Sequence, residues 1–167
     1  CIIGFFFLCR PGDFVETTSI SLSRPFRFGD VQFLVQQRWY AGPVVPLEAL
    51  AAARSATLRY NNQKNGIRGQ GITMGATGDP HICPVRTLER RVRHLREHNA
   101  PVDTPIYMFW DYSFATPQGK VYSVHVTHAL RLGAAALFSP LGIEPHEISC
   151  RSLRPGGATA MLCARID

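Results

Sequence analysis

A strand–turn–strand pattern near the middle of the chain constrains its fold more than any other feature. Residues 56–60 (Ala-Thr-Leu-Arg-Tyr) alternate apolar and polar side chains, which is the period of a half-buried strand. Asn65-Gly66 is typical of a tight hairpin turn. Residues 67–74 supply a return strand. The pattern predicts an antiparallel hairpin with Lys64 at its tip.

Helical patterns lie on both sides of this hairpin. Pro84 can open a helix because the first helical N–H needs no partner, and the helix is predicted to run to residue 98. Its apolar stripe is Val85, Leu88, Val92 and Leu95. Other helices are predicted at residues 1–9, 47–54, 124–137 and from about 151–155 onwards. Other strands are predicted at residues 31–37 and 121–122, and residues 106–110 are predicted to form a buried strand or a short core segment. The order predicts a mostly helical α+β domain with a small antiparallel β-sheet.

Length and cysteine content limit the class of protein. The 167 residues fit a single domain over 1–167, and the 46% hydrophobic content is enough for a packed core. The chain starts at Cys1 and stops within a helical pattern, so both ends are predicted to be cuts in a longer protein. Five scattered cysteines predict reduced thiols in an intracellular protein, in the nucleus if eukaryotic and the cytoplasm if bacterial. The apolar run at 1–9 is too short to span a membrane, so no membrane partner is expected.

The basic residues favour an anionic partner. The net charge is +6, and arginine accounts for all but two of the 18 basic residues, the exceptions being Lys64 and Lys120. A guanidinium group grips phosphate oxygens in a bidentate fork, whereas an ammonium group is a point charge. This bias favours nucleic acid, although many basic proteins are basic only for solubility.

Four motifs follow one another along the chain. The first is an apolar helix that ends at Arg10, with Asp13 three residues later. The second is Lys64 in the hairpin. The third is Arg151-Ser-Leu-Arg154-Pro155, and the fourth is the helix that follows it, Gly156-Gly-Ala-Thr159.

At these residues the chain resembles the tyrosine recombinases, the phage-integrase-like DNA strand-exchange enzymes. In that family an arginine followed three residues later by an acid ends an apolar helix, and a hairpin lysine comes next. The second family box reads His-x-Leu-Arg-His before a helix with Ala-Thr. Here Arg151 and Pro155 replace the two histidines. The resemblance covers nearly the whole chain and implies a DNA breaking–rejoining catalytic core.

The resemblance implies a role for each matching residue. Arg10 and Arg154 would hold the non-bridging oxygens of a DNA phosphodiester and stabilise the charge of the transition state. Lys64 would protonate the leaving 5′ oxygen as a general acid. Arg151 could bind phosphate but would not give up a proton. The four residues are predicted to line one basic pocket. Neither metal nor cofactor is implied, because a protein–DNA phosphodiester stores the energy.

The nucleophile of this family is missing from the sequence. Its members attack DNA through a tyrosine that follows the second box, and every tyrosine here precedes Arg154. The chain alone is therefore expected not to cleave DNA. The complete protein is expected to bind double-stranded DNA as a homo-oligomer.

Further arginines are predicted to follow the DNA backbone. They are Arg68 beside the hairpin turn and Arg86, Arg90 and Arg93 off the apolar stripe of the 84–98 helix. The alternative is a solvated charged face. A second alternative for this region is a zinc site formed by His81, Cys83, His94 and His98, but the spacing lacks a CxxC pair.

Three functions remain open on the sequence. The chain can be part of an active recombinase, a DNA-binding relic of the same fold that does not cleave, or an arginine-rich domain for acidic protein partners. Convergence of the distant basic residues into one pocket would argue against the third.

Overall fold

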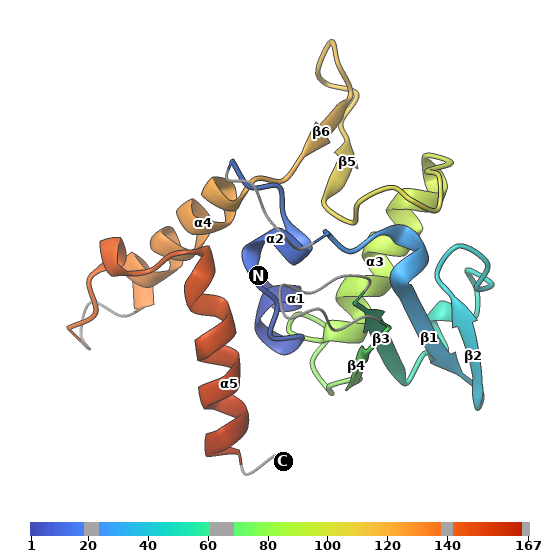
Figure 1. Cartoon of the computed structure of the whole chain (residues 1–167), viewed down its shortest axis with the longest axis horizontal. Helices are drawn as coiled ribbons and strands as arrows, with labels where there is room; N and C mark the ends of the chain where they lie inside the picture. The colour runs from blue at the N-terminus through green and yellow to red at the C-terminus, as the bar shows by residue number, and fades with distance from the viewer. Residues whose placement is uncertain (19–23, 61–68, 138–141, 165–167) are drawn as a thin grey trace.

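The computed structural model describes residues 1–18, 24–60, 69–137 and 142–164. Within them, four antiparallel strands form the main sheet in the order β2-β1-β3-β4 (Figure 1). The strands are β1 (Val31–Val35), β2 (Arg38–Ala41), β3 (Ser55–Arg59) and β4 (Gly71–Gly75). Strands β3 and β4 pair from Ser55–Gly75 to Arg59–Gly71, which confirms the predicted hairpin. Its turn residues lie outside the described part of the chain.

The core lies between the sheet and helix α3 (Pro84–Glu97). Alternate residues of β1 are buried, among them Phe33, whereas β3 buries three consecutive residues, Ala56 to Leu58. The predicted stripe of α3 is fully buried: Val85, Leu88, Val92 and Leu95 each have no exposed surface. The buried side of α3 therefore has the 3.6-residue period that the sequence predicts.

The N-terminal helix is shorter than predicted. Helix α1 (Ile2–Phe6) ends because Leu8 adopts the left-handed conformation, with φ of 50°. Pro11 then occupies the first turn of a second short helix, α2 (Pro11–Phe14). Arg10 has an extended backbone and lies between the two helices.

Helices α4 (Ser123–Leu137) and α5 (Leu153–Cys163) follow. Figure 1 places α1 between α5 on one side and α3 with the sheet on the other. The apolar side chains of α4 are only partly covered. Val126 is buried and Leu130 is partly buried, but Leu137 is 69% exposed.

Two predicted elements differ from the structure. Residues 47–54 form only the 3-10 turn η2 (Leu50–Ala52) instead of an α-helix. The strand predicted at 121–122 is instead β6 (Gln118–Lys120), which pairs with β5 (Met108–Trp110) in a separate hairpin. Beyond β6, Tyr122 forms only an isolated bridge to Glu16.

The α+β class with a small antiparallel sheet is thus confirmed. None of the helices in the described ranges is long and apolar enough to cross a membrane. The link to a DNA breaking–rejoining core remains a proposal.

The β1–β2 turn carries backbone strain that can be relieved. Gln36 and Gln37 connect the paired residues Val35 and Arg38, and both have positive φ, 46° and 66°. This is the conformation for which Asn-Gly is favoured. The double variant Gln36→Asn, Gln37→Gly should therefore raise the free energy of unfolding by about 1 kcal/mol in urea melts. An unchanged or lower stability would contradict this reading of the turn.

Two histidines hold the β5–β6 hairpin against α3. The backbone N–H of Trp110 donates to His94 Nε2 at 3.1 Å. The His98 ring stacks on Trp110 with centroids 5.0 Å apart, and His98 Nδ1 lies 3.2 Å from the Tyr112 hydroxyl. The bond from Trp110 requires His94 Nε2 to carry no proton.

Acid should therefore loosen this hairpin. Burial, Arg91 and His98 together lower the pKa of His94, so the unfolded chain binds the proton more tightly than the folded chain. The stabilisation is complete above the ordinary histidine pKa of about 6.5 and is lost as the pH falls through the lowered value. Trp110 fluorescence, isolated by Trp39→Phe, should stay constant above neutral pH and change in acid. In His94→Gln this change should be absent. Fluorescence that stays constant in acid in the Trp39→Phe protein would contradict this role of His94.

Candidate functional site: a pocket between Arg10 and Arg154

Arg10 and Arg154, from opposite ends of the sequence, line one pocket of about 230 Å³. Arg10 comes from the junction of α1 and α2, and Arg154 from the first turn of α5. The other polar residues that line the pocket are Asp13 of α2, Tyr60 directly after β3, and Gln70 directly before β4. Three separate parts of the fold therefore meet at this pocket.

Gly157 makes this meeting possible. A Cβ at this position would lie 2.9 Å from Leu8 Cδ2 and 3.0 Å from the Phe5 carbonyl carbon, and closer still to the Phe5 carbonyl oxygen. Only glycine lets α5 approach the backbone of α1 so closely. Gly157 lies one turn after Arg154, so the contact also sets where Arg154 lies. The Gly156-Gly157 pair thus includes a packing glycine.

Arg10 is fixed through its backbone. Its N–H donates to Asp13 Oδ2 at 2.8 Å, and its carbonyl accepts from the Asp13 N–H at 2.9 Å. The acid three residues after the arginine therefore caps the start of α2. Asp13 is only 4% exposed. Two guanidinium groups and one carboxylate among the described lining residues leave the pocket positively charged.

Tyr60 forms the wall of the pocket on the hairpin side. Its hydroxyl donates to the Phe7 carbonyl at 3.1 Å and lies 3.8 Å from Cys9 Sγ. Burial, followed by the neighbouring Cys9, raises the pKa of Tyr60 well above its usual range. A phenol that is buried and already donating is a poor nucleophile. Tyr60 is therefore poorly suited to act as a nucleophile in this pocket.

The other two predicted catalytic residues are Lys64 and Arg151, and the structure describes only Arg151. Lys64, like Arg68, falls in residues 61–68, outside the described residues. The residues that flank this segment, Tyr60 and Gly69, pair through a 2.8 Å backbone hydrogen bond, and Tyr60 lines the pocket. Arg151 is exposed in η5 (Cys150–Ser152) and is not among the described residues that line the pocket.

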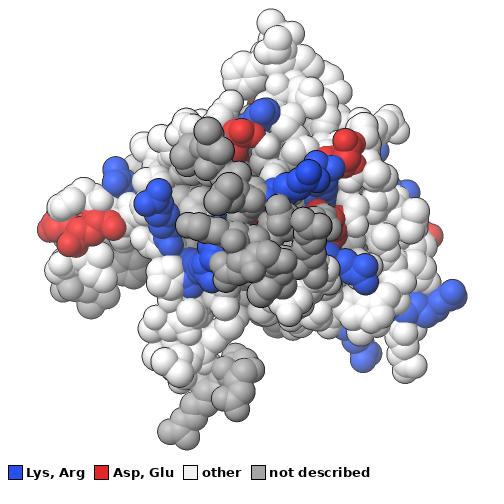
Figure 2. All heavy atoms as spheres, viewed as in Figure 1, with Lys and Arg blue, Asp and Glu red and all other residues white. Residues whose placement is uncertain are grey.

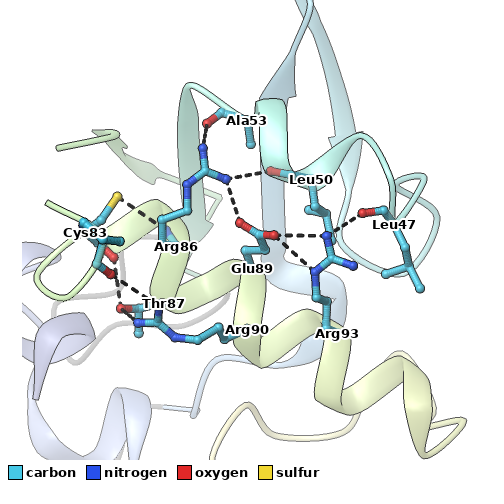
Figure 3. A network of polar contacts seen from close by, with 10 residues as sticks. Leu47, Leu50, Ala53, Cys83, Arg86, Thr87, Glu89, Arg90 and Arg93 are labelled. Atoms are coloured by element: carbon cyan, nitrogen blue, oxygen red, sulfur yellow. Dashed lines mark hydrogen bonds and ion pairs between the residues drawn. The ribbon is translucent and has the colours of Figure 1, made fainter. Parts of the chain in front are cut away.

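Two of the arginines predicted to contact DNA have partners inside the protein (Figure 3). Arg86 donates to the carbonyls of Leu50 and Ala53, and Arg93 donates to that of Leu47. Both also pair with Glu89, at 2.6 Å and 3.0 Å. These arginines hold residues 47–53 against α3, so their presence does not require a DNA contact.

Arg90 and Arg91 differ from that pair. Arg90 is exposed and bonds only locally, to the Pro80 carbonyl and the Thr87 hydroxyl. Arg90 therefore stays a candidate for a contact with the DNA backbone. Within the described part of the chain, the buried Nε and Nη2 atoms of Arg91 have no hydrogen-bond partner, and burial lowers the pKa of Arg91 to about 10.

Basic side chains on the face shown in Figure 2 lie on both sides of the grey residues at its centre, with fewer acidic ones among them.

The described residues contain no group of three or more histidine, cysteine or acidic side chains that could hold a metal ion. The zinc alternative therefore has no support. His94 and His98 instead contact Trp110.

Sequence reasoning missed two polar residues that line the pocket, Tyr60 and Gln70. Tyr60 follows the alternation that buries Ala56 and Leu58, so its inward position could have been predicted. Its contact with α1 could not, because it joins distant parts of the chain. Gln70 carries no signal in the sequence.

Comparisons of the chain with models of protein families, with curated proteins and with solved structures found no match.

Proposed function

We propose that the chain binds a DNA phosphodiester between Arg10 and Arg154, as part of a tyrosine-recombinase-like strand-exchange enzyme. The observation that supports this most is their convergence in one positive pocket beside the hairpin that carries Lys64. Two guanidinium forks can hold the non-bridging oxygens of a phosphate, and their charge opposes the negative charge that grows in the transition state.

The remaining chemistry follows the family resemblance. Lys64 would protonate the leaving 5′ oxygen, and a tyrosine outside this sequence would form the 3′-phosphotyrosine bond. Sites would be paired by a homo-oligomer on double-stranded DNA. Arg151 has no assigned role in this proposal, since it is exposed and does not line the pocket.

A DNA-binding relic is the second candidate. The replacement of the family histidine by Arg151 and the occupied hydroxyl of Tyr60 both favour binding without cleavage. The third candidate, a domain for acidic protein partners, loses support because Arg86 and Arg93 are used inside the fold.

Salt-dependent duplex binding tests the proposal. The logarithm of the association constant should fall linearly with the logarithm of the salt concentration. Arg10→Ala and Arg154→Ala should each lower that slope by about one, as loss of one phosphate contact predicts. Fluorescence anisotropy of a labelled duplex measures it.

The matched control is Arg38→Ala, which removes an exposed arginine from β2. Slopes that are unchanged in both pocket variants would exclude the pocket as the phosphate site. An absence of salt-dependent duplex binding in the unmodified chain would favour the acidic-partner alternative.

A further inference from the structure

The end of α1 needs a hydrogen-bond donor from elsewhere in the protein. Carbonyl groups in the last turn of a helix have no partner within that helix. The Phe7 carbonyl accepts a hydrogen bond from the Tyr60 hydroxyl at 3.1 Å. The Cys9 thiol lies 3.5 Å from the same carbonyl oxygen. Both donors are buried, with Tyr60 only 5% exposed.

This contact lies three residues before Arg10. Leu8 turns the chain at positive φ, Cys9 is fully buried, and Arg10 then enters the pocket. Only Leu8 and Cys9 separate Phe7 from Arg10 in the sequence. A shift of the Phe7 carbonyl would therefore also move Arg10.

Tyr60 itself is held by the hairpin. Its backbone N–H donates to the Gln70 carbonyl at 2.7 Å, and its carbonyl accepts from Gly69 at 2.8 Å. Its ring packs against Phe26 with centroids 4.8 Å apart. The hydroxyl thus joins the base of the β3–β4 hairpin to the segment that presents Arg10.

We propose that Tyr60 is a positioning residue, whose hydroxyl fixes Arg10 relative to the hairpin through the Phe7 carbonyl. This inference rests on the proposed function only for its effect on phosphate binding. The order that Tyr60 imposes on residues 8–10 can be measured without any ligand.

The test compares Tyr60→Phe with Tyr107→Phe. Each variant loses one hydroxyl and keeps the ring. Tyr107 bonds to Glu16 at the base of the other hairpin and does not line the pocket. Two quantities are measured: the backbone ¹⁵N heteronuclear NOE at residues 8–10, and the dissociation constant for inorganic phosphate from NMR shifts. Both are measured at a temperature well below the thermal unfolding midpoint of each variant.

In Tyr60→Phe we expect lower NOE values at residues 8–10 and phosphate binding weaker by about two- to tenfold, which is the range for one lost hydrogen bond. Tyr107→Phe should change neither. Adding Cys9→Ser to Tyr60→Phe should restore much of both, because a hydroxyl at position 9 can donate to the Phe7 carbonyl. A general loss of stability would not be rescued in this way.

The outcomes separate the two proposals. If Tyr60→Phe leaves both the NOE values and the phosphate affinity unchanged, the positioning role is wrong. If the unmodified chain binds no phosphate but Tyr60→Phe still loses order at residues 8–10, the positioning role holds and the proposed function fails.

Discussion

Replacing Gly157 with alanine should lower the free energy of unfolding by about 3 kcal/mol, at the upper end of the usual cost of overpacking. The added methyl group would meet the Phe5 backbone and the Leu8 side chain within about 3 Å. Backbone atoms of α1 cannot rotate aside, so α5 must move away. Urea unfolding followed by circular dichroism measures the loss.

Gly156 is the matched control for this variant. A Cβ there would meet only the Phe5 ring, at an ordinary 3.8 Å. Gly156→Ala should therefore raise stability by up to about 1 kcal/mol, which is the difference in helix propensity. Equal effects of the two substitutions would contradict the close approach of α5 to α1. Gly157→Ala should also weaken phosphate binding, because Arg154 moves with α5.

Arg154→Ala should abolish covalent protein–DNA adducts in a form of the protein that carries a tyrosine after Arg154. A lost electrostatic contact to the transition state commonly reduces the rate by about 10² to 10³-fold. The fold should be intact, because Arg154 is exposed in the first turn of α5. Nicked duplexes that trap the 3′-phosphotyrosine bond provide the measurement.

Two further variants sharpen that result. Arg154→Lys keeps the charge but loses the bidentate fork, so it should recover only part of the adduct formation. Arg151→Ala distinguishes the structure from the family motif: the motif gives position 151 a phosphate contact, whereas the structure leaves Arg151 outside the pocket. Equal losses in Arg151→Ala and Arg154→Ala would contradict the position of Arg151 outside the phosphate site.

The sequence predicted the elements whose stability is local or whose burial is periodic. The stripe of α3 is buried as the spacing of Val85, Leu88, Val92 and Leu95 indicates. The β3–β4 hairpin follows from its alternation. Arg10 and Arg154 were identified by motif before the fold brought them together.

The wrong prediction for residues 47–54 has a tertiary cause. This alanine-rich segment favours a helix by propensity, but three of its carbonyls, those of Leu47, Leu50 and Ala53, accept from arginine side chains of α3. The same contacts give Arg86 and Arg93 a structural role that charge patterning could not reveal. The short helical turn and the role of these arginines both depend on contacts between segments far apart in the sequence.

The central claim is that Arg10 and Arg154 together hold one phosphate group. Crystals soaked in tungstate, which has the charge and tetrahedral shape of phosphate, test it most directly through the anomalous signal of the metal. We predict a single peak in the pocket, with both guanidinium groups in hydrogen-bond range of its oxygens. Crystals that bind tungstate only elsewhere, with the pocket open to solvent, would contradict the claim.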